Sequence, residues 1–247
     1  MRKAPSRLGR TLWVFAGGQL VLTLATLAML AVRLAHLGGG RRICQEKVGG
    51  WAGRAILSLN GIELVVHRAE PWPKAQAFYM ANHSSSLDLP ILMALGMPNT
   101  RTFIKGRFRW YGALGTSLML SGALFTAPQE QHEERVARFA FAERLLRRTK
   151  ESVFGSPEGT RVRGGQLGPF NKGVFHLVTQ LQVPIVPILI LIPEEIDPGG
   201  GIAALPGVVH VHVGSAIDTS AFRLDALDQH KEAVRDHFVA WLRELRP

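Results

Sequence analysis

The strongest constraint on this chain lies near its start, where residues 12–32 form an uncharged stretch of 21 residues. As an α-helix this stretch would be about 31 Å long, close to the hydrocarbon thickness of a bilayer, about 30 Å. A signal peptide fits less well, because the apolar part is longer than a typical h-region and no clear small-residue cleavage site follows it. The sequence therefore predicts a membrane-associated helix near this end of the chain.

Basic residues flank the apolar stretch on both sides, so the positive-inside rule does not fix its orientation. The flanking cations are Arg2, Lys3, Arg7, Arg10, Arg33, Arg41, Arg42 and Lys47. A helix that spans the bilayer and a helix that enters one leaflet, with both flanks cytoplasmic, remain open. Apolar residues between Val48 and Leu59 predict a second, interfacial helix that ends near Asn60. We therefore expect residues 1–60 to form a membrane-associated helical segment.

The charge balance points to an anionic partner. The 247 residues suit one large domain or a domain with a small appendage, and 29 Lys and Arg against 19 Asp and Glu give a net charge of +10. Membrane lipid, phosphorylated substrates and nucleic acid all qualify. Nucleic acid fits least, because aromatic residues make up only 8% and no zinc-finger spacing or arginine-rich helix is present. The single cysteine, Cys44, excludes an intramolecular disulfide and fits a reducing compartment.

From residue 61 onward, strand-like and helix-like segments alternate. The segments typical of strands are residues 62–66, 77–81, 102–104, 123–126, 152–155, 185–192 and 208–213. The segments typical of helices are residues 131–149, 171–180 and 224–245. This alternation predicts an α/β fold over residues 61–247, with a mixed, largely parallel sheet covered by helices.

The segment after the second predicted strand, residues 82–90, combines a histidine, three serines and an aspartate. Its composition predicts a helix that begins close to Ser86. Along one continuous helix, His83 and Asp88 would point about 140° apart, so they meet only if the turn folds back. A carboxylate behind a histidine fixes one imidazole tautomer and stabilises the imidazolium. We therefore predict that His83 is a general base oriented by Asp88; a capped helix start with a satisfied histidine is the alternative.

Residues 156–161, with the sequence Ser-Pro-Glu-Gly-Thr-Arg, follow another predicted strand. Open α/β sheets bind ligands at the carboxyl ends of their strands. The planar fork of Arg161 suits a phosphate, Thr160 adds a donor, and Glu158 would hold the arginine or accept from a glycerol hydroxyl. Without His83, a simple turn with a surface Glu–Arg pair would explain the pattern equally well.

Three cations, Lys105, Arg107 and Arg109, come directly before the aromatic pair Trp110 and Tyr111. This pattern predicts either a basic rim around an anionic substrate or a solvated, charged turn.

Two further patterns favour no site. His210 and His212 would share one face of a strand, but no third ligand is evident in the sequence, so we expect no metal site. Residues 84–86 are serines, but they lack the G-x-S-x-G elbow of a serine hydrolase.

In order along the chain, these motifs resemble those of the glycerolipid acyltransferase family of 1-acylglycerol-3-phosphate acyltransferases. The resemblance covers residues 62–190 and four blocks: Asn-His-x4-Asp at 82–88, residues 103–115, the Phe-x-x-Pro-Glu-Gly-Thr-Arg block at 154–161 and Val-Pro-Ile-Val-Pro at 183–187. In the second block, Lys105 and Gly115 match the family pattern, whereas Gly112 replaces its usual proline. The family also has an N-terminal two-helix membrane motif, which the layout of residues 1–60 resembles.

The resemblance implies transfer of an acyl group from acyl-CoA or an acyl carrier protein to 1-acyl-sn-glycerol 3-phosphate, which forms phosphatidic acid. It implies that His83 and Asp88 are catalytic and that the substrate is bound by Lys105, Glu158, Gly159, Thr160 and Arg161. A backbone N–H near Gly159 would stabilise the oxyanion. No metal or cofactor is required, and the enzyme would lie at the cytoplasmic face of the inner membrane. The pattern leaves the oligomeric state open.

Three alternatives to this function remain. In the first, the enzyme acylates another lysolipid, such as a lyso-ornithine lipid or a lysophospholipid. In the second, the chain is a membrane-bound serine hydrolase. In the third, it is a basic membrane-binding protein without enzymatic activity.

Overall fold

The computed structural model of this chain describes residues 7–128, 130–162, 165–197 and 201–245. The flanking cations Arg2 and Lys3 lie outside this range. Within it, seven strands form one sheet in the order β1-β7-β6-β2-β5-β3-β4. The strands are β1 (Ile62–Arg68), β2 (Phe78–Ala81), β3 (Thr100–Lys105), β4 (Leu124–Thr126), β5 (Ser152–Gly155), β6 (Ile185–Leu191) and β7 (Gly207–Val213). Every neighbouring pair is parallel except β6 and β7, so the expected mixed, largely parallel sheet is confirmed.

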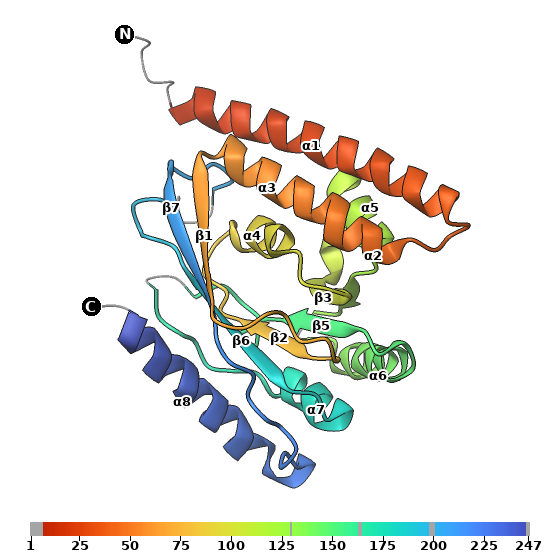
Figure 1. Cartoon of the computed structure of the whole chain (residues 1–247), viewed down its shortest axis with the longest axis vertical. Helices are drawn as coiled ribbons and strands as arrows, with labels where there is room; N and C mark the ends of the chain where they lie inside the picture. Colours follow the sequence, from red (N-terminus) through yellow and green to blue (C-terminus); the bar gives the residue numbers. More distant parts are fainter. Residues whose placement is uncertain (1–6, 129, 163–164, 198–200, 246–247) are drawn as a thin grey trace.

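Helices cover both faces of this sheet (Figure 1). The N-terminal half contributes α1 (Arg7–Ala35), α2 (Arg41–Ile43), the π-helical turn η1 (Cys44–Gly49), α3 (Gly50–Leu59), α4 (Asp88–Leu95), the 3₁₀ turn η2 (Gly106–Trp110) and α5 (Gly112–Leu120). The rest contributes α6 (His132–Thr149), α7 (Lys172–Leu181), η3 (Leu224–Ala226) and α8 (Leu227–Leu245). Helices α1, α3 and α4 lie on one side of the sheet, and α6, α7 and α8 lie on the other.

The two helical layers explain why the central strands read as continuous apolar runs. All four residues of β2 are buried: Tyr79 and Ala81 belong to the core under α3 and α4, and Phe78 and Met80 belong to the core under α6, α7 and α8. Side chains that alternate between two faces must all be apolar when both faces are covered. The central strands are therefore held between two packed helical layers, which fixes the position of the residues that follow them.

The predicted strands are all present, with ends that differ by one or two residues. The helix expected to begin close to Ser86 begins at Asp88. Helix α5 has no counterpart in the sequence prediction, because its sequence contains two glycines and gives weak helical propensity. At its first residue, Gly112 has a φ of 52°, which the proline ring forbids. The glycine that replaces the family's proline thus gives the start of α5 a different backbone conformation.

Helix α1 packs one face against the rest of the protein and leaves another face bare. Val14, Leu22, Ala25 and Met29 are buried, and the Thr26 hydroxyl lies 2.7 Å from the Ser117 hydroxyl of α5. The exposed apolar residues of α1 are Leu8, Leu12, Trp13, Phe15, Leu20, Leu24, Leu27, Leu30 and Leu34. By length and composition, this helix can cross a membrane. A continuous apolar face of this size fits contact with lipid.

Helix α3 crosses α4 closely because a glycine stands at the crossing. A Cβ atom at Gly53 would lie 2.5 Å from the carbonyl oxygen of Pro90 and 2.6 Å from the amide nitrogen of Ala94. The absence of a side chain lets the two backbones meet. The predicted second helix is thereby fixed on the helix that carries Asp88.

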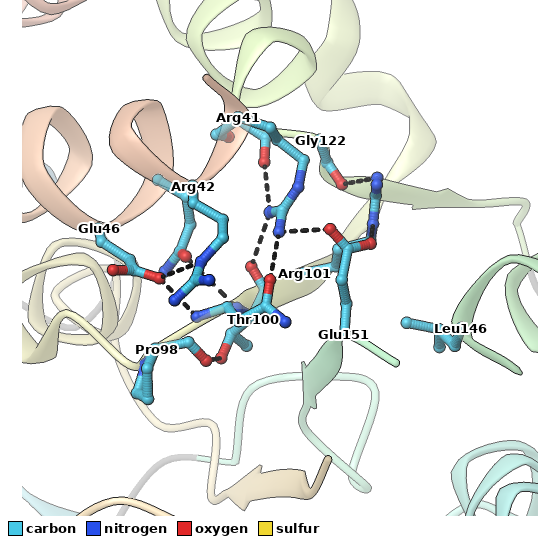
Figure 2. A network of polar contacts seen from close by, with 12 residues as sticks. Arg41, Arg42, Glu46, Pro98, Thr100, Arg101, Gly122, Leu146 and Glu151 are labelled. Atoms are coloured by element: carbon cyan, nitrogen blue, oxygen red, sulfur yellow. Dashed lines mark hydrogen bonds and ion pairs between the residues drawn. The ribbon is translucent and has the colours of Figure 1, made fainter. Parts of the chain in front are cut away.

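A buried ion-pair network joins α2 to the base of the sheet (Figure 2). Arg41 pairs with Glu151 at 2.5 Å, and Arg101 of β3 pairs with the other oxygen of the same carboxylate. Arg41 also donates to the carbonyl oxygens of Thr100 and Ser121. Burial alone would raise the pKa of Glu151, but the bond from Arg101 and the charge of Arg41 outweigh it and hold this pKa below its ordinary value. Contacts of the N-terminal helices with the α/β part therefore cross the expected boundary at residue 60.

Candidate active site

Three of the predicted motifs meet at one edge of the sheet. Strands β2, β5 and β3 are neighbours and parallel, so their carboxyl ends lie side by side. His83 follows β2, Lys105 ends β3, and residues 156–161 follow β5. A hydrogen bond from the Val162 amide to the His83 carbonyl oxygen, at 2.8 Å, joins two of these segments directly. This edge is where open α/β sheets bind ligands.

His83 and Asp88 are in contact, because the turn between them folds back. The His83 Nδ1 atom lies 2.6 Å from Asp88 Oδ2. The same oxygen accepts from the amides of Ser84 at 2.8 Å and Ser85 at 3.0 Å. Asp88 is 3% exposed, whereas the side chain of His83 is 29% exposed. With Nδ1–H donating to the carboxylate, the lone pair of Nε2 is left for a substrate proton.

Asp88 also stabilises the start of the helix that it begins. As the first residue of α4, it points its carboxylate back to the amides of the preceding turn, and no serine side chain caps the helix. Three donors, the His83 ring and the amides of Ser84 and Ser85, converge on one oxygen of this carboxylate. The carboxylate thus fixes both the histidine ring and the turn that carries it.

Glu158 holds the backbone of the histidine segment. One carboxylate oxygen accepts from the His83 amide at 2.6 Å, and the other accepts from the Gly168 amide at 2.7 Å. The side chain is 4% exposed, and burial raises its pKa although both amide bonds act in the opposite direction. Among the described residues no ion pair joins Glu158 to Arg161, because the glutamate points inward and the arginine lies on the surface. The expected contact of Glu158 with Arg161 is therefore not formed in the described part of the chain.

Two asparagines that the sequence-based site omits also order this edge. The side chain of Asn82 donates to the carbonyl oxygen of Ile190 at 3.0 Å and accepts from its amide at 2.8 Å. The side chain of Asn171 donates to the carbonyl oxygens of Pro157 and Glu158 at 3.1 and 2.8 Å. Asn82 was visible as part of the Asn-His motif, whereas nothing local to Asn171 indicates its partner. Each asparagine fixes the exit of one strand.

The cations at the edge remain unneutralised. Lys105, Arg107 and Arg161 are exposed, and in the described ranges none has a carboxylate within ion-pair distance. Partial burial lowers the pKa of Lys105, and the charges of Arg107 and Arg161 lower it further. Gly159 and Thr160 are exposed in the same loop. Several positive charges without internal partners favour an anionic ligand.

The described residues contain no group of three His, Cys, Asp or Glu side chains arranged to hold a metal ion.

The fold is an α/β sheet preceded by a long apolar helix, and the edge of the sheet carries a histidine in contact with a buried carboxylate. The protein-family model described as Acyltransferase matches residues 63–191. The chain belongs to this acyltransferase family, which the resemblance of the four blocks anticipates.

Relatives and a solved structure agree with this assignment. A 1-acyl-sn-glycerol-3-phosphate acyltransferase alpha from Ovis aries is 29% identical over 89% of this chain and 76% of its own length. A 1-acyl-sn-glycerol-3-phosphate acyltransferase from Saccharomyces cerevisiae is 27% identical over 97% of this chain and 80% of its own length. The crystal structure of the 1-acyl-sn-glycerophosphate (LPA) acyltransferase PlsC from Thermotoga maritima matches with a TM-score of 0.65 and 21% identity, covering 91% of this chain and 95% of that one. The structural match shows a shared fold.

Proposed function

We propose that this enzyme transfers an acyl group from an acyl thioester to the free hydroxyl of 1-acyl-sn-glycerol 3-phosphate and so forms phosphatidic acid for phospholipid synthesis. The names of the relatives support this acceptor. The observation that carries the proposal is the 2.6 Å contact between His83 and a buried carboxylate, at an edge with exposed cations. The acceptor hydroxyl needs a base to remove its proton, which His83 can supply, and the phosphate monoester of the acceptor needs cations to bind it.

In the proposed mechanism, Nε2 of His83 removes the proton of the acceptor hydroxyl as its oxygen attacks the thioester carbonyl. Asp88 stabilises the imidazolium that forms. When the tetrahedral intermediate collapses, the C–S bond breaks and the imidazolium returns the proton to the leaving thiolate. The products are an ester and a free thiol, and His83 is again neutral. The sequence of steps forms no covalent intermediate on the enzyme.

The proposed roles at the sheet edge follow the exposure of each residue. Lys105 and Arg161 bind the phosphate, since both are exposed cations without an internal partner in the described residues. Thr160 and the backbone at Gly159, exposed in the same loop, supply further donors to substrate or oxyanion. Glu158 acts on the substrate indirectly, because both its oxygens accept from backbone amides. Its role is to position His83.

We propose that the N-terminal segment, residues 1–60, associates with the cytoplasmic face of the cell membrane. The bare apolar face of α1 supports contact with lipid, and a cytoplasmic site gives access to acyl-CoA and to acyl carrier protein. Lysophosphatidic acid is itself a membrane lipid, so a membrane-bound site meets its acceptor in the bilayer.

A serine hydrolase fits the geometry less well. The Ser85 hydroxyl donates to Asp197 at 3.0 Å, and the Ser86 hydroxyl donates to the carbonyl oxygen of Gly201 at 2.7 Å. A nucleophilic serine would instead be expected to contact His83.

The acceptor can be tested with purified protein in phospholipid vesicles, a radiolabelled acyl donor and a panel of lysolipids. Acyl-CoA and acyl carrier protein thioesters are supplied in separate reactions, and lysophosphatidic acid is compared with lysophosphatidylethanolamine and lyso-ornithine lipid. Labelled phosphatidic acid as the main product supports the proposal. Labelled product from another lysolipid alone, or free fatty acid alone, overturns it.

A further inference from the structure

Three histidine side chains meet on the sheet away from the proposed active site. His67 lies on β1, and His210 and His212 lie on β7. The valines that alternate with the β7 histidines, such as Val211, are buried in the core under α3 and α4, so the histidines occupy the other face of the strand. His67 is the register partner of His212 in the parallel β1–β7 pair. The three residues are therefore neighbours on one accessible face.

The pairing of the two strands supplies the third imidazole ligand that the sequence pattern lacks. A His-x-His pair on one strand gives two imidazoles on the same face, and a metal site needs at least one more ligand. The third histidine is 143 residues from His210 in sequence, so only the pairing of β1 with β7 reveals it. Two imidazoles from one strand and one from its neighbour offer a triangle of ligands with an open fourth position.

The three rings are in contact with one another. His67 Nε2 lies 2.9 Å from His210 Nδ1. In a tetrahedral zinc site with Zn–N distances of about 2.0–2.1 Å, two ligating nitrogens are about 3.3 Å apart. The His67 ring also stacks on His212, with ring centroids 4.3 Å apart. The two nitrogens point at each other in a hydrogen bond and the third ring is stacked on His67, so the rings must rotate before three nitrogens can bind one ion.

The rings stack and hydrogen-bond to each other, so in the described part of the chain the three nitrogens do not converge on one point. His67 is exposed, so its side chain rotates readily, and the rings of His210 and His212 are only partly covered. A metal ion would replace the hydrogen bond between His67 and His210 with two coordinate bonds.

We propose that His67, His210 and His212 form a binding site for one divalent transition-metal ion of the zinc type. Imidazole ligands favour Zn²⁺, Ni²⁺ and Cu²⁺ over Mg²⁺ and Ca²⁺. The site joins the edge strand β1 to β7, and β1 follows α3 directly along the chain. A bound ion therefore stabilises the connection between the N-terminal helices and the sheet, independently of acyl transfer.

The test is a calorimetric titration of metal-stripped, untagged, full-length protein in detergent with ZnCl₂. We expect one Zn²⁺ per chain, a higher melting temperature with Zn²⁺ and no effect of Mg²⁺. His67→Gln or His210→Gln should each weaken binding by at least about 10- to 100-fold, since even loss of an outer partner of a metal ligand has such an effect. His176→Gln, at an exposed histidine of α7, is the matched control and should bind like the parent protein.

A second readout needs no variant. Co²⁺ bound by three imidazoles and one water should give the intense visible absorption of tetrahedral cobalt, and added Zn²⁺ should abolish it. A spectrum like that of octahedral aqueous Co²⁺, the absence of stoichiometric Zn²⁺ binding, or binding that persists in the His67→Gln/His210→Gln/His212→Gln variant would overturn the site.

Discussion

At the scale of single residues, two buried carboxylates act on one histidine from different sides. Asp88 accepts from the ring of His83, and Glu158 accepts from its backbone amide. The orientation of the imidazole ring and the position of the backbone of His83 are thereby fixed, while its Nε2 atom stays accessible. Positioning of this kind supports catalysis, because a general base must lie within hydrogen-bond reach of the proton that it removes.

His83→Ala should reduce turnover by about 10²- to 10⁴-fold, the usual contribution of a general base, without loss of membrane association. Asp88→Asn should have a similar effect, because the amide no longer stabilises the imidazolium. Initial rates with labelled acyl-CoA and lysophosphatidic acid check both. His132→Ala, at an exposed histidine of α6, serves as the control. Near-normal rates in the His83 variant would contradict the mechanism.

Arg161→Lys keeps a positive charge but removes the fork that binds two phosphate oxygens at once. If Arg161 binds the acceptor, KM for lysophosphatidic acid should rise by the equivalent of about 1.5–3 kcal/mol, the value of a charge-assisted hydrogen bond. KM for the acyl donor should stay constant.

The control for this variant is Arg148→Lys, at an exposed residue of α6, and the melting temperature of each variant is measured as well. A defect confined to the donor would place Arg161 at the thioester. A lower melting temperature with equal damage for every acceptor would indicate a structural role instead.

The site also shows which contacts a sequence can reveal. The pair His83 and Asp88 was predictable, because both lie in one turn whose composition indicates where it folds. The bond that the His83 amide donates to Glu158 and the bonds between Asn82 and Ile190 join residues 75 and 108 positions apart. No local pattern encodes such contacts, since they depend on which strands become neighbours.

At the scale of elements, the central strands β2 and β6 were predictable because both faces of the sheet are covered there, so their residues are apolar. Helix α5 was not, because its apolar residues share the segment with Gly112 and Gly115 and show little amphipathic pattern. Its stability comes instead from packing against α1, as in the contact of Ser117 with Thr26.

Helix α1 has two faces, and we expect different variants to separate their functions. From the sequence alone, removal of residues 1–36 should weaken membrane association and leave the α/β part folded. The structure indicates that the deletion also destabilises the protein, because this helix buries residues against α3 and α5. Deletion should therefore weaken liposome binding and lower the melting temperature together.

Point variants test the two effects independently. Leu20→Asn, Leu24→Asn and Leu27→Asn combined change the exposed face, so liposome flotation should decrease while the melting temperature in detergent stays the same. Leu22→Ala changes the buried face and should cost about 2–5 kcal/mol in unfolding free energy without loss of flotation. Salt-resistant flotation of the deletion protein, equal to that of the full chain, would refute the membrane role of α1.

At the scale of the whole molecule, the network around Glu151 joins the N-terminal helices to the sheet. Glu151→Gln leaves Arg41 and Arg101 buried without their counter-charge and should lower the free energy of unfolding by about 3–5 kcal/mol. Glu134→Gln removes an exposed pair with Arg138 on α6 and should change it by less than about 1 kcal/mol. Chemical denaturation in detergent measures both, and equal effects would contradict the structural role of the network.

The same network predicts a direction for acid stability. The pKa of Glu151 is lower in the folded protein than its ordinary value, so its contribution is present above the unfolded pKa and is lost as the pH falls through the folded one. The parent protein should therefore lose stability below about pH 4, and Glu151→Gln should lose less over that interval. Melting temperatures measured from pH 7 to pH 3 test this; identical slopes for the two proteins would exclude Glu151 as the titrating group.

The pairing of β1 with β7 has a consequence for synthesis of the chain. Ile62 pairs with Gly207, 145 residues later. At a translation rate of about 5–20 residues per second, β1 leaves the ribosome about 7–30 s before its partner strand exists. The exposed apolar face of α1 is made before β1, and the sheet does not cover it even when β7 has paired. Delivery to the bilayer during translation would cover this face, so lipid would serve as a folding partner before it becomes the site of the proposed reaction.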